Sequence, residues 1–105
     1  MSDFQKTTIF SILSSERSRK LFEIIIESGL LTSIEIHNKY IGLYGQTNRE
    51  TTYRELEKLQ NGGILNKKYD QIKKKLMYEN NMRSLNLTIR EGKLDFDLDF
   101  FEESI

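Results

Sequence analysis

Three helix-start signals follow each other closely in this chain, and they constrain its fold more than any other feature. The serine pair at 14–15 offers hydroxyl groups that can cap the free amides of a first helix. Thr32 and Glu35 have the spacing of a capping box, in which each residue satisfies a backbone amide of the other. Thr47 and Glu50 repeat that spacing. The sequence therefore predicts three short helices in close succession.

Glycines and apolar spacing give the extent of these helices. The first ends at Gly29, where a left-handed C-cap is needed, and the second loses its pattern through Gly42 and Gly45. The third runs over about 48–61 and stops at 62–63, a glycine pair. Residues at helical spacing are the predicted core, with Phe10 from a preceding turn or two of helix over 8–13: Leu21, Phe22, Ile25, Ile26, Ile34, Ile36, Tyr40, Ile41, Thr52, Leu56 and Leu59. Three such helices, the last two joined by a glycine-bearing turn, have the outline of a helix–turn–helix.

Beyond the glycine pair the apolar spacing changes to period two. Apolar residues alternate before and after the pair 80–81, which is Asn-Asn, and asparagine tolerates the positive φ of a tight hairpin turn. The sequence thus predicts a hairpin closed at this pair. Residues 72–79 could instead form a short helix, because Ile72 and Leu76 are four apart, but we prefer a strand.

The C-terminal stretch 94–101 alternates apolar residues with aspartates. This period favours a strand, whereas Leu94, Leu98 and Phe101 would also mark one stripe of a helix, and the sequence leaves both open.

Length and composition set the class of protein. A chain of 105 residues is long enough for one domain, 1–105, with a core over about 8–94 and an extension over 95–105. It contains no cysteine, which excludes disulfides and thiolate metal sites. No apolar run reaches the length of a membrane span, and no signal peptide begins the chain, so we expect a cytoplasmic protein.

Charge is distributed unevenly along the chain. The formal net charge is zero, yet all sixteen Lys and Arg residues lie at or before Lys93, while five acids crowd residues 95–103. Residues 1–94 therefore carry sixteen bases against eleven acids, a charge of about +5. This asymmetry is typical of a basic binding body with an acidic tail, although a solvated charged surface would look the same.

The segment Thr51-Thr52-Tyr53-Arg54-Glu55-Leu56-Glu57-Lys58-Leu59-Gln60-Asn61-Gly62-Gly63-Ile64-Leu65 resembles the recognition helix and first wing strand of ArsR-type and PadR-type winged-helix regulators. The upstream run 12–22 is similar to the opening of an ArsR-type domain, and Leu87-Thr88 followed by Gly92 is similar to the end of a second wing strand. The resemblance implies an α+β winged helix–turn–helix fold, with a three-helix core and a β-hairpin wing. One departure is the lack of cysteine together with a single histidine, which argues against metal sensing.

The resemblance also implies which residues would meet double-stranded DNA. On the third helix these are Arg49, Thr51, Tyr53, Arg54 and Lys58, since arginine can pair with guanine and hydroxyls suit phosphates. On or around the wing they are Lys67, Lys68, Lys73, Lys74, Lys75 and Arg83, which could neutralise phosphates. Glu50, Glu55 and Glu57 oppose this interpretation, because carboxylates repel phosphate.

Other candidate sites are weak. His37 is a single imidazole, interpreted as a surface or capping residue, and the aspartates at 95–99 lack the glycine turn of a calcium loop. No phosphate loop, nucleophile elbow or metal-ligand pair is present, so we expect no enzyme activity and no cofactor.

The hypothesis from sequence is sequence-specific binding of double-stranded DNA by a small transcriptional regulator. A homodimer is expected on a pseudo-palindromic site, because one small module contacts little DNA. The predicted dimer segments are 3–13 and 94–105, whose apolar residues exceed what short ends require: Phe4, Ile9, Phe10, Phe96, Leu98, Phe100 and Phe101. The alternative is a winged helix that binds another protein in a transcription or chromosome-associated complex.

Overall fold

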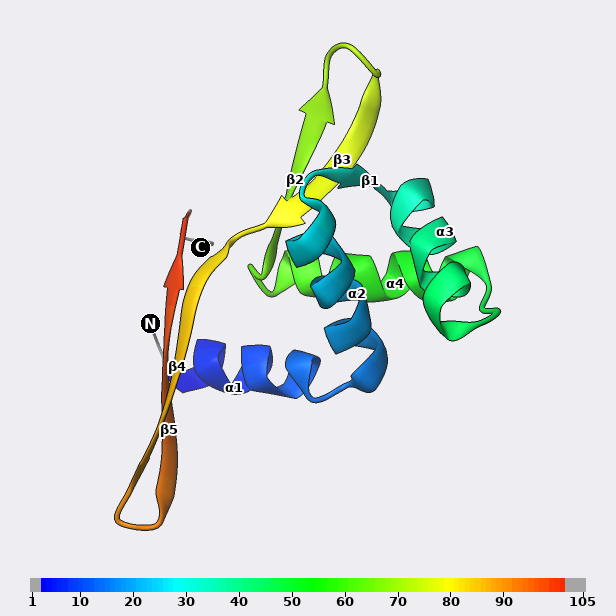
Figure 1. Cartoon of the computed structure of the whole chain (residues 1–105). Coiled ribbons are helices and arrows are strands. Elements are labelled where there is room, and N and C mark those ends of the chain that lie inside the picture. Colours follow the sequence, from blue (N-terminus) through cyan, green and yellow to red (C-terminus); the bar gives the residue numbers. More distant parts are fainter. Residues whose placement is uncertain (1–2, 102–105) are drawn as a thin grey trace.

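The computed structural model describes residues 3–101, except for the side chains of 3–5, 84–90 and 93–98. Four helices and five strands follow in the order shown in Figure 1: α1 (Asp3–Leu13), α2 (Glu16–Ser28), β1 (Leu31–Thr32), α3 (Ser33–Tyr44), α4 (Arg49–Asn61), β2 (Leu65–Asp70), β3 (Lys75–Asn80), β4 (Met82–Arg90) and β5 (Lys93–Phe100). The three predicted helices correspond to α2, α3 and α4. The preceding helix, α1, is longer than the one or two turns expected.

Helix caps confirm two of the three predicted starts. The Ser15 side chain caps α2, and Thr32 forms the complete capping box with Glu35 at the start of α3. The predicted box of Thr47 and Glu50 is wrong. Asn48 caps α4 instead, because its Oδ1 accepts a hydrogen bond of 2.8 Å from the Thr51 amide.

The core lies where α2, α3 and α4 meet the base of the sheet. Its buried members include the predicted residues Leu21, Ile25, Ile36, Tyr40, Thr52, Leu56 and Leu59, together with Ile64 and Leu65 of the chain entering β2. Two predicted core residues, Phe10 and Ile26, are instead exposed. Phe22 is only partly buried. Ile9, one position before Phe10, takes the buried place on α1, because that helix turns Phe10 away from the core.

Strands β1, β3 and β2 form an antiparallel sheet in that spatial order. The β2–β3 hairpin, which we call the wing, projects beyond the helices in Figure 1. The strand prediction for 72–79 is confirmed from Lys75 onward, and residues 71–74 form the turn.

The predicted hairpin at Asn80-Asn81 is wrong. Asn81 is buried, and its Nδ2 donates to the Gly63 carbonyl while its Oδ1 accepts from Asn66 Nδ2. Its amide also donates to the Ile64 carbonyl. Asn81 thus fastens the end of β3 to the start of β2, and it does not turn the chain back.

The actual turn after β4 is the pair 91–92, Glu-Gly, in which both residues have positive φ (51° and 76°). This is the requirement of a two-residue type I′ hairpin, which glycine meets at the second position without strain. It joins β4 to β5, so the strand alternative for residues 94–101 is correct up to Phe100. Residues 87–92, which resembled a second wing strand, therefore lie outside the wing.

The β4–β5 hairpin is a separate two-stranded ribbon that extends past α1 and away from the helical core (Figure 1). Its register sets apolar residues opposite apolar residues, as in Leu85 with Leu98 and Leu87 with Phe96. Between them stand polar pairs, such as Thr88 with Asp95. Along the ribbon the register thus alternates pairs of apolar residues with pairs of polar residues.

Candidate nucleic-acid interface

Helix α4 is held by two polar contacts to the helices behind it. The Ser18 hydroxyl of α2 donates to Glu55 Oε2 at 2.8 Å, and Nδ1 of His37 on α3 lies 2.8 Å from the Thr52 hydroxyl. Ser18, His37 and Thr52 are all buried. The prediction that His37 lies on the surface or caps a helix is therefore wrong. Its buried hydrogen bond fixes the rotation of α4 against α3, which determines the residues that α4 exposes.

Two of the three glutamates of α4, Glu55 and Glu57, have hydrogen-bond or ion-pair partners within the fold. Besides binding Ser18, Glu55 forms an ion pair with Lys58 at 3.3 Å, and its side chain is largely covered. Glu57 accepts hydrogen bonds from Lys67 Nζ at 2.6 Å and from the Tyr78 hydroxyl at 2.7 Å. Only Glu50, among the described acids of α4, has no such partner. The repulsion of phosphate expected from three carboxylates therefore comes chiefly from one.

Arg49, Arg54 and Lys58 are the exposed cations of α4, and of these only Lys58 has an ion-pair partner among the described residues. Neither arginine side chain makes an ion pair or hydrogen bond to any residue within 3–101. Tyr53 is half-buried against the core, with its ring 6.4 Å from that of His37 in an edge-to-face arrangement. Thr51 differs from the expectation, because its hydroxyl donates to Asn48 Oδ1 at 2.8 Å and is occupied by the cap.

The base of the wing is joined to α4 through Glu57. This carboxylate lies between Lys67 of β2 and Tyr78 of β3, which face each other in the strand register. The hydrogen bond from Lys67 and, with a smaller effect, the one from Tyr78 lower the pKa of Glu57. Burial has the largest effect on Tyr78 and raises its pKa well above the usual range. The hydrogen bond to the Glu57 carboxylate and the charge of that carboxylate raise it further. The ionised carboxylate and the neutral phenol are therefore the forms that hold the wing on α4.

This contact predicts a pH-dependent stability difference for Glu57→Gln. A carboxyl with a lowered folded-state pKa contributes stability above its ordinary pKa of about 4.5 and loses that contribution as pH falls through the folded value. Because the side chain is 43% exposed, we expect the variant to be less stable by only about 1 kcal/mol at pH 7. The difference should shrink on acidification, as measured by urea unfolding. Glu23→Gln, at an exposed carboxylate in the middle of α2 with no described partner, is the control and should show neither effect.

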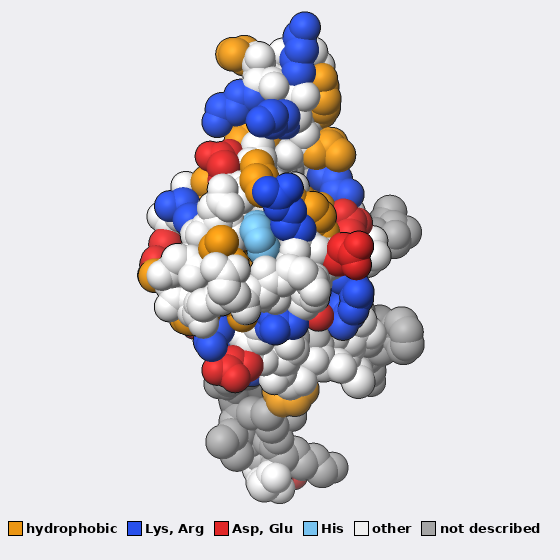
Figure 2. Space-filling view, turned by 90° about the vertical axis from the view of Figure 1, so that its right-hand side faces the viewer, with side chains coloured by type: hydrophobic (Ala, Val, Ile, Leu, Met, Phe, Trp, Pro, Cys, Tyr) orange, Lys and Arg blue, Asp and Glu red, His pale blue; other side chains and the backbone are white. Residues whose placement is uncertain are grey.

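The turn of the wing carries Lys73 and Lys74, and β3 begins at Lys75. Among the described residues, none of the three forms an ion pair, whereas Lys68 pairs with Glu79 at 2.7 Å. Figure 2 shows the wing at the top of the molecule with Lys and Arg side chains over it and hydrophobic side chains between them. Seven described Lys and Arg side chains have no hydrogen-bond or ion-pair partner. Five of them lie on α4 and at the tip of the wing, and the other two, Arg17 and Lys39, lie on α2 and α3.

Arg83 does not lie on the wing. It belongs to β4, where its guanidinium is 3.7 Å from Asp99 and stacks over the Phe101 ring at 4.9 Å. The sequence placed Arg83 with the wing lysines because it put the hairpin at the wrong pair of residues.

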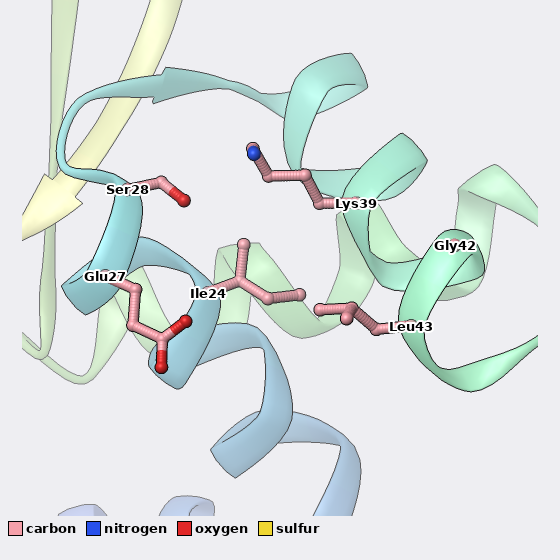
Figure 3. Close-up of a pocket in the computed structure, with 6 residues that line it drawn as sticks. All are labelled: Ile24, Glu27, Ser28, Lys39, Gly42 and Leu43. Carbon is pink, nitrogen blue, oxygen red and sulfur yellow. The ribbon is translucent and has the colours of Figure 1, made fainter.

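A hollow of about 410 Å³ lies between α2 and α3 (Figure 3). Ile24 and Leu43 point into it, and Glu27 and Lys39 stand on its two sides. None of the residues predicted to bind DNA lines this hollow. The described residues also hold no cluster of three or more His, Asp or Glu side chains that could bind a metal ion. No helix within 3–101 is long and apolar enough to cross a membrane.

No protein-family model matches this chain, and no curated protein matches it. Among solved structures, it is similar to the crystal structure of the Vibrio cholerae ferric uptake regulator, a protein described as having DNA-binding domains. The TM-score is 0.57 at 19% sequence identity, and the match covers 81% of this chain and 68% of the other. The fold is a winged helix. At this identity the likeness concerns the fold alone, and it does not favour the ArsR or PadR family over other winged helices.

Proposed function

We propose that this winged helix binds double-stranded DNA as a small transcriptional regulator, with α4 in the major groove and the wing on the phosphate backbone. The observation that carries the proposal is that two of the three acids on α4 are paired within the fold, whereas several cations on α4 and the wing are not. Glu55 and Glu57 are held by partners within the fold, while the side chains of Arg49, Arg54 and the lysines at 73–75 form no ion pair or hydrogen bond among the described residues. Lys73 and Lys75 are near enough to Glu35 to lower the pKa of its carboxyl, without pairing with it. A surface with unpaired cations on a helix and on the adjacent wing suits a polyanion.

The predicted DNA-binding residues fall into groups according to whether their side chains already have a partner within the fold. Arg49 and Arg54 are proposed to reach base edges or phosphates, with the Tyr53 hydroxyl as a further donor. Lys73, Lys74 and Lys75 are proposed to lie on phosphates. Lys58, Lys67 and Lys68 would have to leave a carboxylate partner to contact DNA, so we assign them a secondary role. Thr51 and Arg83 are not included, for the reasons given above.

A second candidate function is binding to another protein. Apolar side chains exposed on the wing favour it, since Tyr69 and Leu76 are both 53% exposed. A gel-shift titration with the DNA upstream of the protein's own gene, against an unrelated duplex of equal length, separates the two functions. We expect a shift with both duplexes at low salt and tighter binding to the first. Failure to shift either duplex at low salt would favour the protein-binding function.

We further propose that the protein is a homodimer through α1 and the β4–β5 ribbon. A two-stranded ribbon is at best marginally stable alone, and the register of this one pairs apolar residues, such as Leu85 with Leu98, which favours a covering surface. Phe10 on α1 and Phe101 after β5 are exposed, and α1 and the end of β5 lie on the same side of the molecule in Figure 1. Ile9 and Phe100 from the predicted dimer set belong to the monomer core or pack against it. The side chains of Phe4, Phe96 and Leu98 lie outside the described residues.

The dimer proposal predicts that the intact chain sediments as a dimer at micromolar concentration. Phe10→Glu combined with Phe101→Glu should shift it to the monomer, because two carboxylates would have to be buried in the interface. Leu43→Glu is the control, since Leu43 is equally apolar and 64% exposed but lies on α3. A chain that stays monomeric at high concentration would contradict the proposal and the paired half-site arrangement with it.

A further inference from the structure

The tip of the wing exposes the most accessible large hydrophobic side chain that the structure describes. Ile72 is 93% exposed, in a turn whose neighbours are all polar or charged. A single exposed apolar residue is common on protein surfaces and carries no meaning alone. Here, however, hydrogen bonds within the turn fix the position of Ile72, and two more exposed apolar residues lie beside it on the wing.

Asp70 fixes the turn. Its Oδ1 accepts hydrogen bonds from the amides of Ile72 (2.8 Å) and Lys73 (2.9 Å), and its carbonyl accepts one from the Lys74 amide (2.8 Å). Lys74 has a φ of 54°, which places it in the left-handed region. These bonds hold Ile72 at the outermost point of a closed turn, so its exposure follows from an ordered backbone.

Two further apolar residues lie just behind Ile72 on the wing. Tyr69 and Leu76 are directly opposite each other in the β2–β3 register. They share the hairpin face of Lys67 and Tyr78, two positions toward the base, and those two side chains bind Glu57 on α4. Tyr69 and Leu76 are therefore on the α4 side of the wing, and together with Ile72 at the tip we call them the apolar strip. Ile72 also borders a shallow hollow with Tyr69, Leu30 and Met77.

Three cations that form no ion pair with a described residue lie beside this strip. Lys73 and Lys74 follow Ile72 in the turn, and Lys75 starts the returning strand. Phosphates alone would require only the lysines, because an aliphatic side chain gains nothing beside a charged oxygen. Two stacked base pairs of a duplex have the same arrangement: the base faces are apolar, and phosphates lie on either side of them. An exposed apolar side chain with cations beside it therefore suits insertion between base pairs.

We infer that Ile72 is an apolar wedge that enters duplex DNA between two base pairs, while the lysines at 73–75 hold the flanking phosphates. Insertion of such a wedge through the minor groove partly unstacks one step and kinks the duplex by roughly 20–90°. The step would be a flexible one, such as TA or CA, since these unstack at the lowest cost. This inference rests on the proposed DNA binding and adds bending of the duplex and a preference for deformable sequence.

The test measures the bend directly, by energy transfer between dyes on the two ends of a short duplex at saturating protein. We expect the intact chain to shorten the end-to-end distance. Ile72→Ala should bring that distance close to the value of free DNA and weaken binding on the order of 10-fold. Lys73→Gln should weaken binding but leave the distance at saturation unchanged. Because Ile72 is 93% exposed, its loss should leave the urea midpoint of unfolding unchanged.

The outcomes separate this inference from the proposed function. Binding without any change in distance, or with the same change for Ile72→Ala, would overturn the wedge and leave DNA binding in place. Absence of binding to any duplex at low salt would overturn both. Leu43→Ala, at an exposed apolar residue on α3, is the control and should bind and bend DNA as the intact chain does.

Discussion

Replacing Lys73, Lys74 and Lys75 together with glutamine is expected to flatten the salt dependence of DNA binding by roughly 2–3 in the slope of log affinity against log salt. Each phosphate neutralised by a lysine releases condensed counterions, and each contributes about −0.9 to that slope. Since none of the three has a described ion-pair partner, no protein contact has to break before they act. Their loss should therefore appear almost entirely in the electrostatic part of binding.

The same numbers give the size of the effect. A slope change of about 2.7 means that the ratio of intact to variant affinity falls about 40-fold between 50 and 200 mM salt. Lys6→Gln, Lys20→Gln and Lys39→Gln combined, on α1, α2 and α3, remove the same charge and serve as the control. If this control flattens the slope equally, then general charge and not the wing explains the binding.

Arg54→Ala is expected to weaken binding to the preferred site by about 1–3 kcal/mol, or roughly 5- to 150-fold, with folding intact. Arg54 is exposed on α4, and truncating it breaks no contact within the described chain. Arg54→Lys is the informative control, because it keeps the charge but lacks the planar fork that pairs with guanine. Measurements on the preferred duplex and on a random one should show a selective loss for both variants, larger for alanine.

Two other outcomes would revise the role of Arg54. Equal losses on both duplexes would assign it to a phosphate, and Arg54→Lys would then bind nearly as well as the intact chain. No loss on either duplex would remove Arg54 from the interface.

The helical part of the fold was predictable because its signals are local. Capping residues and glycines mark α2 and α3 within a residue or two, and the stripe of Thr52, Leu56 and Leu59 gives the buried side of α4. The exception is the start of α4, where Asn48 and the preceding Thr47 are both good caps. Which of two adjacent caps is used depends on the path of the chain through Gly45, and no local pattern contains that.

The hairpins were harder to predict because the sequence offers more turns than the fold uses. Asn80-Asn81 is a suitable turn pair, but the Asn81 side chain bonds to Gly63 and Asn66, which lie 18 and 15 residues earlier. Those long-range contacts keep the chain running on into β4. The pair 91–92, Glu-Gly, was the turn actually used, and its glycine was the available signal.

The residue types of the proposed interface follow from the sequence, but the sequence does not show which of these side chains already have a partner in the fold. Glu55 and Glu57 count against DNA binding when read as charges along a helix. In three dimensions they bind Ser18, Lys58, Lys67 and Tyr78, and they neutralise two of the lysines predicted to contact DNA. The burial of His37 was likewise hidden, because its partner Thr52 lies on another helix.

The central claim is that α4 and the wing bind duplex DNA, and a salt titration of the intact chain tests it most directly. Fluorescence anisotropy with a labelled duplex between about 50 and 200 mM salt would give the affinity at each point. The three wing lysines, with neither, one or both of the α4 arginines on a phosphate, predict a linear plot with a slope of roughly −3 to −5 per protomer. No binding at the lowest salt, or an affinity independent of salt, would contradict the account and leave a winged helix whose partner is another protein.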